Sequence, residues 1–147
     1  MTLTNRCPIP SGLEMMSIIN LLLDTHAFIW WYSEPEKLSD RVLAACQDVT
    51  NTLALSVASV WEMQIKAQLG KLQLTKPLSE IIQHQQDQNQ LHIMPVTLPV
   101  ILALDDLPMH HRDPFDRLLI AQARVEQFVL VSNDSQFKKY SVSLFWN

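Results

Sequence analysis

Four carboxylates, far apart in the chain, stand where an apolar run ends or a helix is expected to begin: Asp24, Glu62, Asp116 and Asp134. In an open α/β sheet, the carboxyl ends of the strands and the starts of the following helices lie along one edge, where ligands bind. Four acids gathered at that edge would repel one another unless a divalent cation lay among them. This distribution predicts a metal-dependent enzyme.

Each acid also has an ordinary structural interpretation. Asp24 could cap the helix after the first strand by accepting hydrogen bonds from the free amides of that helix. Glu62 follows Ser59 in an S-x-x-E pattern, which is typical of a capping box. Asp134 could be a turn or cap residue, and Asn133 could fill the same role. These interpretations explain the acids one at a time and leave their shared position at strand ends and helix starts unexplained.

The DPFD segment places two acids at the start of one helix. Asp113 is well placed as its N-cap, Pro114 as its first residue and Asp116 as its third, so helix-start preferences can explain both acids. Asp113 fits the capping role better. Asp116 lies one turn in, on the same face as Ile120 at helical spacing. A carboxylate that opens a buried stripe needs a partner, because a bare buried charge is expensive. Asp116 is therefore the stronger candidate for chemistry.

Two further groups of residues have alternative interpretations. His111 and Arg112 precede the DPFD segment and could face a metal or a phosphate, although solvated side chains are the simpler interpretation. Trp30, Trp31 and Trp61 could stack on nucleic-acid bases, but tryptophans at these spacings are more typical of core or of a partner interface. Together with Tyr32, the first two would form an apolar patch that suits a protein interface. We expect this patch and the helices around Trp61 to form a docking surface.

The apolar pattern alternates between strand-like and helix-like segments. Strands are expected at 18–23, 52–55, 91–96, 128–131 and 142–145. Helices are expected at 25–31, 38–47, 57–69, 77–88, 98–104 and 114–127, with Gly70 ending the third. Short strands that alternate with helices predict an α/β fold, with a mostly parallel sheet of about five strands covered on both faces.

Composition narrows the class of protein. The 147 residues fit one domain, and 48% hydrophobic with 18% charged residues is typical of a globular protein. No apolar run reaches the roughly 18 residues that span a bilayer, and the N-terminus lacks the apolar stretch of a secretory signal, so we expect a cytoplasmic protein. The net charge of -4 opposes a chain-wide basic footprint, yet eight of the 11 Lys and Arg residues follow position 60.

The first 16 residues form an expected appendage, and residues 17–147 form the expected domain. The appendage contains two prolines, and Met15 or Met16 could be the true start in place of Met1. Two cysteines, Cys7 and Cys46, are too few for a disulfide framework and show no zinc-site spacing, so we expect Cys46 to be a buried thiol on a helix.

Four segments together resemble a known family: LLLDTHAFIWW, LSVASVWEMQIKAQLGKL, HRDPFDRLLIAQA and LVSNDSQF. They look like the four motifs of PIN-domain nucleases, and most like the VapC-type ribonuclease toxins of bacterial toxin–antitoxin pairs. The resemblance covers about 17–145. It implies a three-layer α/β/α sandwich, Mg²⁺ or Mn²⁺ at the carboxylate edge, an RNA substrate hydrolysed at its phosphodiester bonds, a small antitoxin protein as partner, and a homodimer.

The resemblance also assigns expected roles to residues. The four conserved acids of the family match Asp24, Glu62, Asp116 and Asp134, as metal ligands or, for Glu62, as a base that orients water. Secondary candidates match Asp113, Ser132 and Asn133. The candidates for contacting substrate phosphate are the basic residues near the motifs, namely Lys66, Lys71, Arg112 and Arg117.

Two rival interpretations remain. The LLLDT segment also resembles the nucleophile motif of haloacid-dehalogenase-type phosphatases, but that motif needs an acid where this chain has His26. A non-catalytic module could keep the fold only to sequester a protein or an RNA. The presence of all four acids favours the metal-dependent endoribonuclease, and metal-dependent cleavage distinguishes the two.

Overall fold

The computed structural model describes residues 18–147, so the predicted appendage, the alternative starts and Cys7 lie outside the described residues. The described part contains a sheet of five strands in the order β3-β2-β1-β4-β5, and every neighbouring pair is parallel. The strands are β1 (Asn20–Leu23), β2 (Thr52–Ser56), β3 (His92–Met94), β4 (Val129–Val131) and β5 (Leu144–Phe145). The predicted α/β class and parallel sheet are confirmed.

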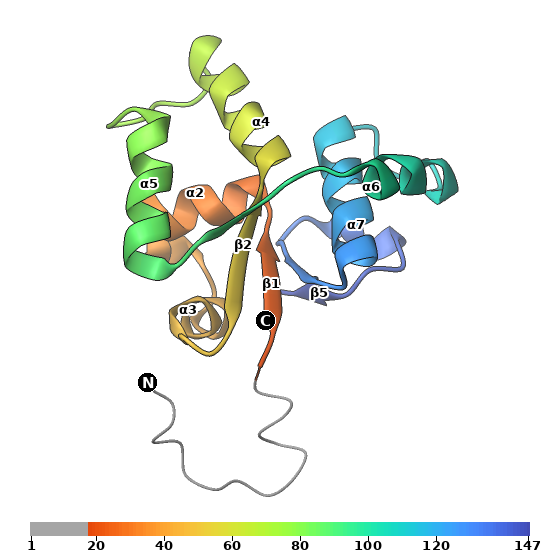
Figure 1. Cartoon of the computed structure of the whole chain (residues 1–147), viewed down its shortest axis with the longest axis horizontal. Coiled ribbons are helices and arrows are strands. Elements are labelled where there is room, and N and C mark those ends of the chain that lie inside the picture. Colours follow the sequence, from red (N-terminus) through yellow and green to blue (C-terminus); the bar gives the residue numbers. More distant parts are fainter. Residues whose placement is uncertain (1–17) are drawn as a thin grey trace, which may run out of the picture.

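Helices cover both faces of the sheet, as Figure 1 shows. On one side lie α2 (Thr25–Ser33), α3 (Asp40–Gln47), α4 (Val57–Gln68) and α5 (Leu78–Asn89); on the other lie α6 (Leu98–Ala103) and α7 (Pro114–Glu126). Among the described residues no helix combines the length and the apolar content that crossing a membrane requires.

The central strand β1 divides the core into two. Leu21 and Leu23 join the core cluster beneath α2 to α5, whereas Leu22 joins the cluster beneath α6 and α7. Successive side chains of a strand point to opposite faces, so a strand buried on both faces must be apolar at every position. All three leucines are fully buried, and each contributes about 1.5–3 kcal/mol by leaving water.

Three short 3₁₀ helices in the described part of the chain were not predicted. They are η1 (Pro35–Lys37), η2 (Leu104–Asp106) and η3 (Ser135–Lys139). Segments of three to five residues are too short to show a hydrophobic period, so their sequences cannot be distinguished from those of loops. The last one matters most, because η3 begins directly after Asp134.

Two predictions about the ends of α4 have opposite outcomes. Gly70 has φ 74°, the left-handed conformation that favours glycine after a helix, as predicted. The predicted capping box at α4 is wrong. Ser56 is its N-cap and accepts the N–H of Ala58, while Ser59 is buried inside the helix. Glu62 is therefore free of a capping role.

The predicted docking patch on α2 is less exposed than an open apolar surface would be. Trp30, Trp31 and Tyr32 are half-buried and pack against the core beneath α2. Trp30 meets Trp146 edge to face, with the ring centroids 6.0 Å apart, so the C-terminal residues cover part of this surface. The exposed tryptophan is Trp61 of α4, at 59%, on the other segment that was predicted to take part in docking. The sequence pattern alone could not reveal that the chain end folds back over α2.

Candidate metal centre and active site

The four predicted acids come from the carboxyl ends of neighbouring strands and from two helices beside them. β1 and β4 are paired, with Leu23 opposite Val131, and the N–H of Asp24 donates to the carbonyl of Val131 at 3.1 Å. This pairing places Asp24 beside the Ser132–Asp134 turn. Glu62 comes from α4, which follows β2, and Asp116 comes from the first turn of α7.

Asp24 caps α2 and also belongs to the acidic cluster. Its Oδ1 accepts the N–H of Ala27 at 2.7 Å, so the capping interpretation is confirmed. Burial raises the pKa of Asp24, and the negative charge of Asp134 adds to the rise, while hydrogen bonds from Ser132 and Ala27 oppose it. The carboxyl is only 6% exposed. Capping therefore uses one oxygen and leaves the group in an environment that resists a negative charge.

Glu62 is buried and both of its oxygens have partners. Oε1 accepts the hydroxyl of Thr25 at 2.6 Å, and Oε2 pairs with Nζ of Lys66 at 3.0 Å. Thr25 follows Asp24 directly, so this hydrogen bond ties α4 to the start of α2. The contact joins residues 37 positions apart, and no local pattern could have predicted it. Glu62 thus links the acidic cluster to a lysine at its rim.

Asp113 caps α7 as predicted, while Asp116 lies one turn into the helix among the other acids. Asp113 Oδ1 caps α7 by accepting the N–H groups of Phe115 at 2.9 Å and Asp116 at 3.4 Å. Burial raises the pKa of Asp116 to about 7, with further increases from the charges of Asp113, Glu62 and Asp24, while His111 opposes the rise. These charges act on Asp116 because the fold gathers the acids, and their repulsion is the instability that a cation would remove.

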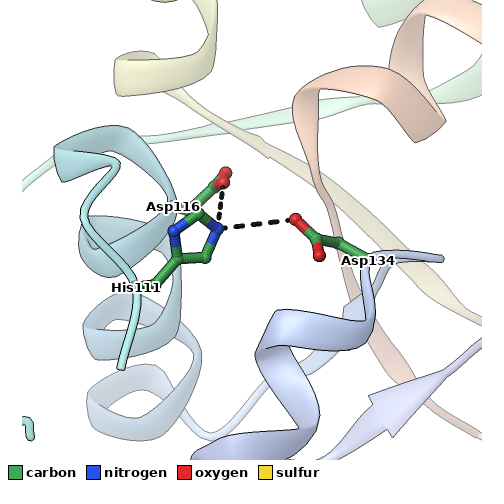
Figure 2. A group of neighbouring side chains, drawn as sticks. All are labelled: His111, Asp116 and Asp134. Carbon is green, nitrogen blue, oxygen red and sulfur yellow. Dashed lines mark ion pairs between the residues drawn. The ribbon is translucent and has the colours of Figure 1, made fainter. Parts of the chain in front are cut away.

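His111 lies in the cluster, between two of the acids (Figure 2). Its Nε2 is 2.9 Å from Oδ2 of Asp116 and 3.4 Å from Oδ2 of Asp134. One ligand-type atom from each of these three residues lies within 4.8 Å of the other two. The simpler sequence-based interpretation, a solvated His111, is therefore wrong. The position of His111 just before the DPFD segment was the signal for the alternative.

The turn after β4 supports the last acid. Asp134 Oδ1 caps η3 by accepting the N–H of Gln136 at 2.9 Å, while its other oxygen faces His111. Ser132 Oγ accepts the N–H of Asp134 at 3.0 Å, and the same side chain is hydrogen-bonded to Asp24. Ser132 therefore holds the two acids at neighbouring strand ends in register. Asn133 is exposed beside them.

The four basic candidates differ in their surroundings. Lys66 is held by Glu62 at the rim of the cluster, and Lys71 and Arg112 are exposed. Arg117 instead donates to the carbonyls of Pro108 at 2.9 Å and Leu104 at 3.4 Å. It fastens η2 and the following loop to α7, and a guanidinium engaged in this way is a poor candidate for binding phosphate.

Two arginine variants separate these roles. Arg117→Ala is expected to lower the free energy of unfolding by about 1–2 kcal/mol, because it removes charged hydrogen bonds to two carbonyls. Arg112→Ala is expected to leave stability unchanged and to reduce the slope of log K against log salt for single-stranded RNA by about 0.7. Chemical denaturation and RNA binding in EDTA measure the two effects. A stability loss in Arg112→Ala together with a lower salt slope in Arg117→Ala would make Arg112 the structural residue and Arg117 the phosphate-binding one.

Comparison with known proteins agrees with the fold and the motifs. The PIN domain family model matches residues 21–142. Ribonuclease VapC22 of Mycobacterium tuberculosis is 31% identical over 123 residues, which are 82% of this chain and 91% of that protein. In the structure of VapBC2 from Rickettsia felis bound to a DNA fragment from its promoter, a chain superposes with a TM-score of 0.66 at 17% identity, covering 88% of this chain and 100% of that one. For VapBC-1 from nontypeable Haemophilus influenzae the TM-score is 0.61 at 15% identity, with 86% and 97% covered.

This chain belongs to the PIN domain family, and the matched region contains Asp24, Glu62, Asp116 and Asp134. The predicted family resemblance is confirmed. The identity with a protein named a ribonuclease extends over 82% of this chain, whereas the two solved structures share the fold alone.

Proposed function

We propose that this protein is a divalent-metal-dependent endoribonuclease that acts in the cytoplasm as the toxin of a toxin–antitoxin pair. The observation that carries the proposal is the acidic cluster, in which burial and mutual repulsion raise the pKa of Asp24 and bring that of Asp116 to about 7. The 31% identity with Ribonuclease VapC22 supports RNA as the substrate.

The donor set suits Mg²⁺ or Mn²⁺. Asp24, Asp116 and Asp134 offer carboxylate oxygens, which these hard cations prefer, and Asp134 is open enough to solvent to admit an ion. We propose these three as the residues that would hold it, with Asp113 stabilising the start of α7 beside them. A bound cation would lower the pKa of a water molecule and stabilise negative charge on the scissile phosphate.

The remaining residues of the site position the cluster and the substrate. Both oxygens of Glu62 are engaged, one by the Thr25 hydroxyl and the other by the Lys66 ammonium group. Glu62 thereby positions the Lys66 ammonium group at the edge of the acidic cluster. Lys66, together with the exposed Lys71 and Arg112, would bind phosphates flanking the cleaved bond. Glu62 could orient the attacking water through its remaining lone pairs, as a carboxylate has about four acceptor positions.

The toxin role requires an antitoxin, and we propose a small protein that docks on the exposed apolar side chains near the site. Solved relatives include VapBC complexes from Rickettsia felis and Haemophilus influenzae. Trp61 is 59% exposed and stacks edge to face on Phe115, with centroids 5.5 Å apart, directly beside the DPFD helix start. A homodimer is also part of the proposal.

Cleavage by the purified protein tests the enzyme proposal. We expect RNA to be cut with Mg²⁺ or Mn²⁺ and to remain intact in EDTA, with activity restored by excess metal. Cleavage that persists after thorough chelation would contradict the metal role. Tight RNA binding without cleavage, at any metal concentration, would favour the non-catalytic module.

A further inference from the structure

His111 reaches the acidic cluster from the loop before α7 (Figure 2). Its Nε2 touches both Asp116 and Asp134, at 2.9 and 3.4 Å, and its ring packs against Phe137 with centroids 5.9 Å apart. The nitrogen is buried, and among the described residues no acceptor meets it with hydrogen-bond geometry. Two carboxylates therefore lie at contact distance from one nitrogen without a directional bond, so the contact is electrostatic.

The other ring nitrogen indicates what Nε2 carries. Nδ1 accepts the backbone N–H of Asp113 at 3.3 Å, so its lone pair is occupied. A neutral imidazole has one protonated nitrogen and one acceptor nitrogen, and the proton must then be on Nε2. A protonated nitrogen cannot bind a metal ion. Metal-binding histidines also donate their second N–H to an acceptor, which is the opposite of the arrangement at Nδ1.

We infer that His111 is a built-in substitute for the cation. Its Nε2–H lies beside the same Asp116 and Asp134 oxygens that a bound cation would contact, and it would have to move aside for the ion to bind. The N–H is positively polarised and seeks the same oxygens as the ion, so the two compete. His111 is thus a positioning residue, and this inference rests on the cation site of the proposed function.

The test compares Mn²⁺ affinity and metal-free stability. His111→Phe removes the N–H and keeps a ring that packs against Phe137. Calorimetric Mn²⁺ binding is expected to tighten about two- to tenfold, the equivalent of one lost competing polar contact. In EDTA the melting temperature is expected to fall by about 2–5 °C, because Asp116 and Asp134 lose the group between them. His111→Gln, which keeps an N–H at similar reach, is expected to restore most of that loss.

His110→Phe is the matched control, because it makes the same change at the adjacent, exposed histidine and should alter neither quantity. Weaker Mn²⁺ binding by His111→Phe would make His111 a ligand and overturn the inference. An unchanged affinity together with an unchanged melting temperature would overturn it as well. Asp116→Asn is measured alongside and is expected to lose Mn²⁺ binding. Binding by that variant at the wild-type level would count against the proposed function, while melting in EDTA still reports on the His111 contact.

Discussion

Asp116→Asn is expected to reduce metal-dependent RNA cleavage by about 1000-fold or more, while the protein stays folded. Asparagine has nearly the same shape but brings no negative charge to the cluster, and loss of a group that acts on the transition state lowers the rate without a comparable loss of substrate binding. RNA cleavage under single-turnover conditions, together with RNA affinity in EDTA, measures the two effects separately.

Asp106→Asn is the matched control for that experiment. Asp106 lies in η2 and is exposed, so the same chemical change there removes a surface charge outside the acidic cluster. We expect its cleavage rate to remain within about twofold of wild type, since exposed charges contribute little to either stability or a distant site. A similar loss in both variants would mean that net charge, rather than the cluster, limits cleavage.

The metal-free protein is expected to lose stability as the pH rises from about 5 to 8. Asp116 has a pKa of about 7 in the folded protein against an ordinary value of 3.8, so the folded state binds more protons than the unfolded chain between those values. Stability falls with pH wherever the folded state holds the extra proton, by an amount on the order of 1–3 kcal/mol here. Burial shifts the pKa of Asp24 in the same direction and adds to the effect.

Two changes should reverse this loss. Mg²⁺ or Mn²⁺ at about 100 times its Kd should add about 2.7 kcal/mol at pH 8, because it binds the ionised carboxylates of the folded state. Asp116→Asn should be more stable than wild type at pH 8 without metal and should show a flatter pH dependence, whereas Asp106→Asn should follow wild type. Denaturation in EDTA at pH 5 and 8 measures both. Stability that rises with pH would contradict the account of the cluster.

The sequence was sufficient wherever structure follows from local pattern. The fully apolar Leu21–Leu23 run predicted a strand buried on both faces, and Asp113 followed by Pro114 predicted the start of α7. The carboxyl ends of parallel strands lie on one edge of the sheet, so the proximity of Asp24 and Asp134 could be predicted once the strands had been recognised. Those predictions needed only the periods of strands and helices and the preferences of helix ends.

Contacts between distant segments could not be predicted in this way. The hydrogen bond from Thr25 to Glu62, the anchoring of Arg117 on two carbonyls and the packing of Trp146 on Trp30 all depend on where loops and the chain end settle. His111 could be predicted only in part. Its position before the DPFD segment was visible in the sequence, but the orientation of its side chain toward the acids was not. A side chain on a loop takes its orientation from tertiary packing, here against Phe137.

The most direct test of the nuclease toxin is induced expression of wild type and Asp116→Asn in bacteria, with growth followed and RNA 5′ ends mapped in both. Growth arrest with new, discrete RNA ends in the wild type alone is the result that the acidic cluster predicts, and the positions of those ends would identify the target RNA. Equal growth and identical 5′ ends, with both proteins folded and soluble at similar levels, would contradict it and leave the PIN fold here as a binding module.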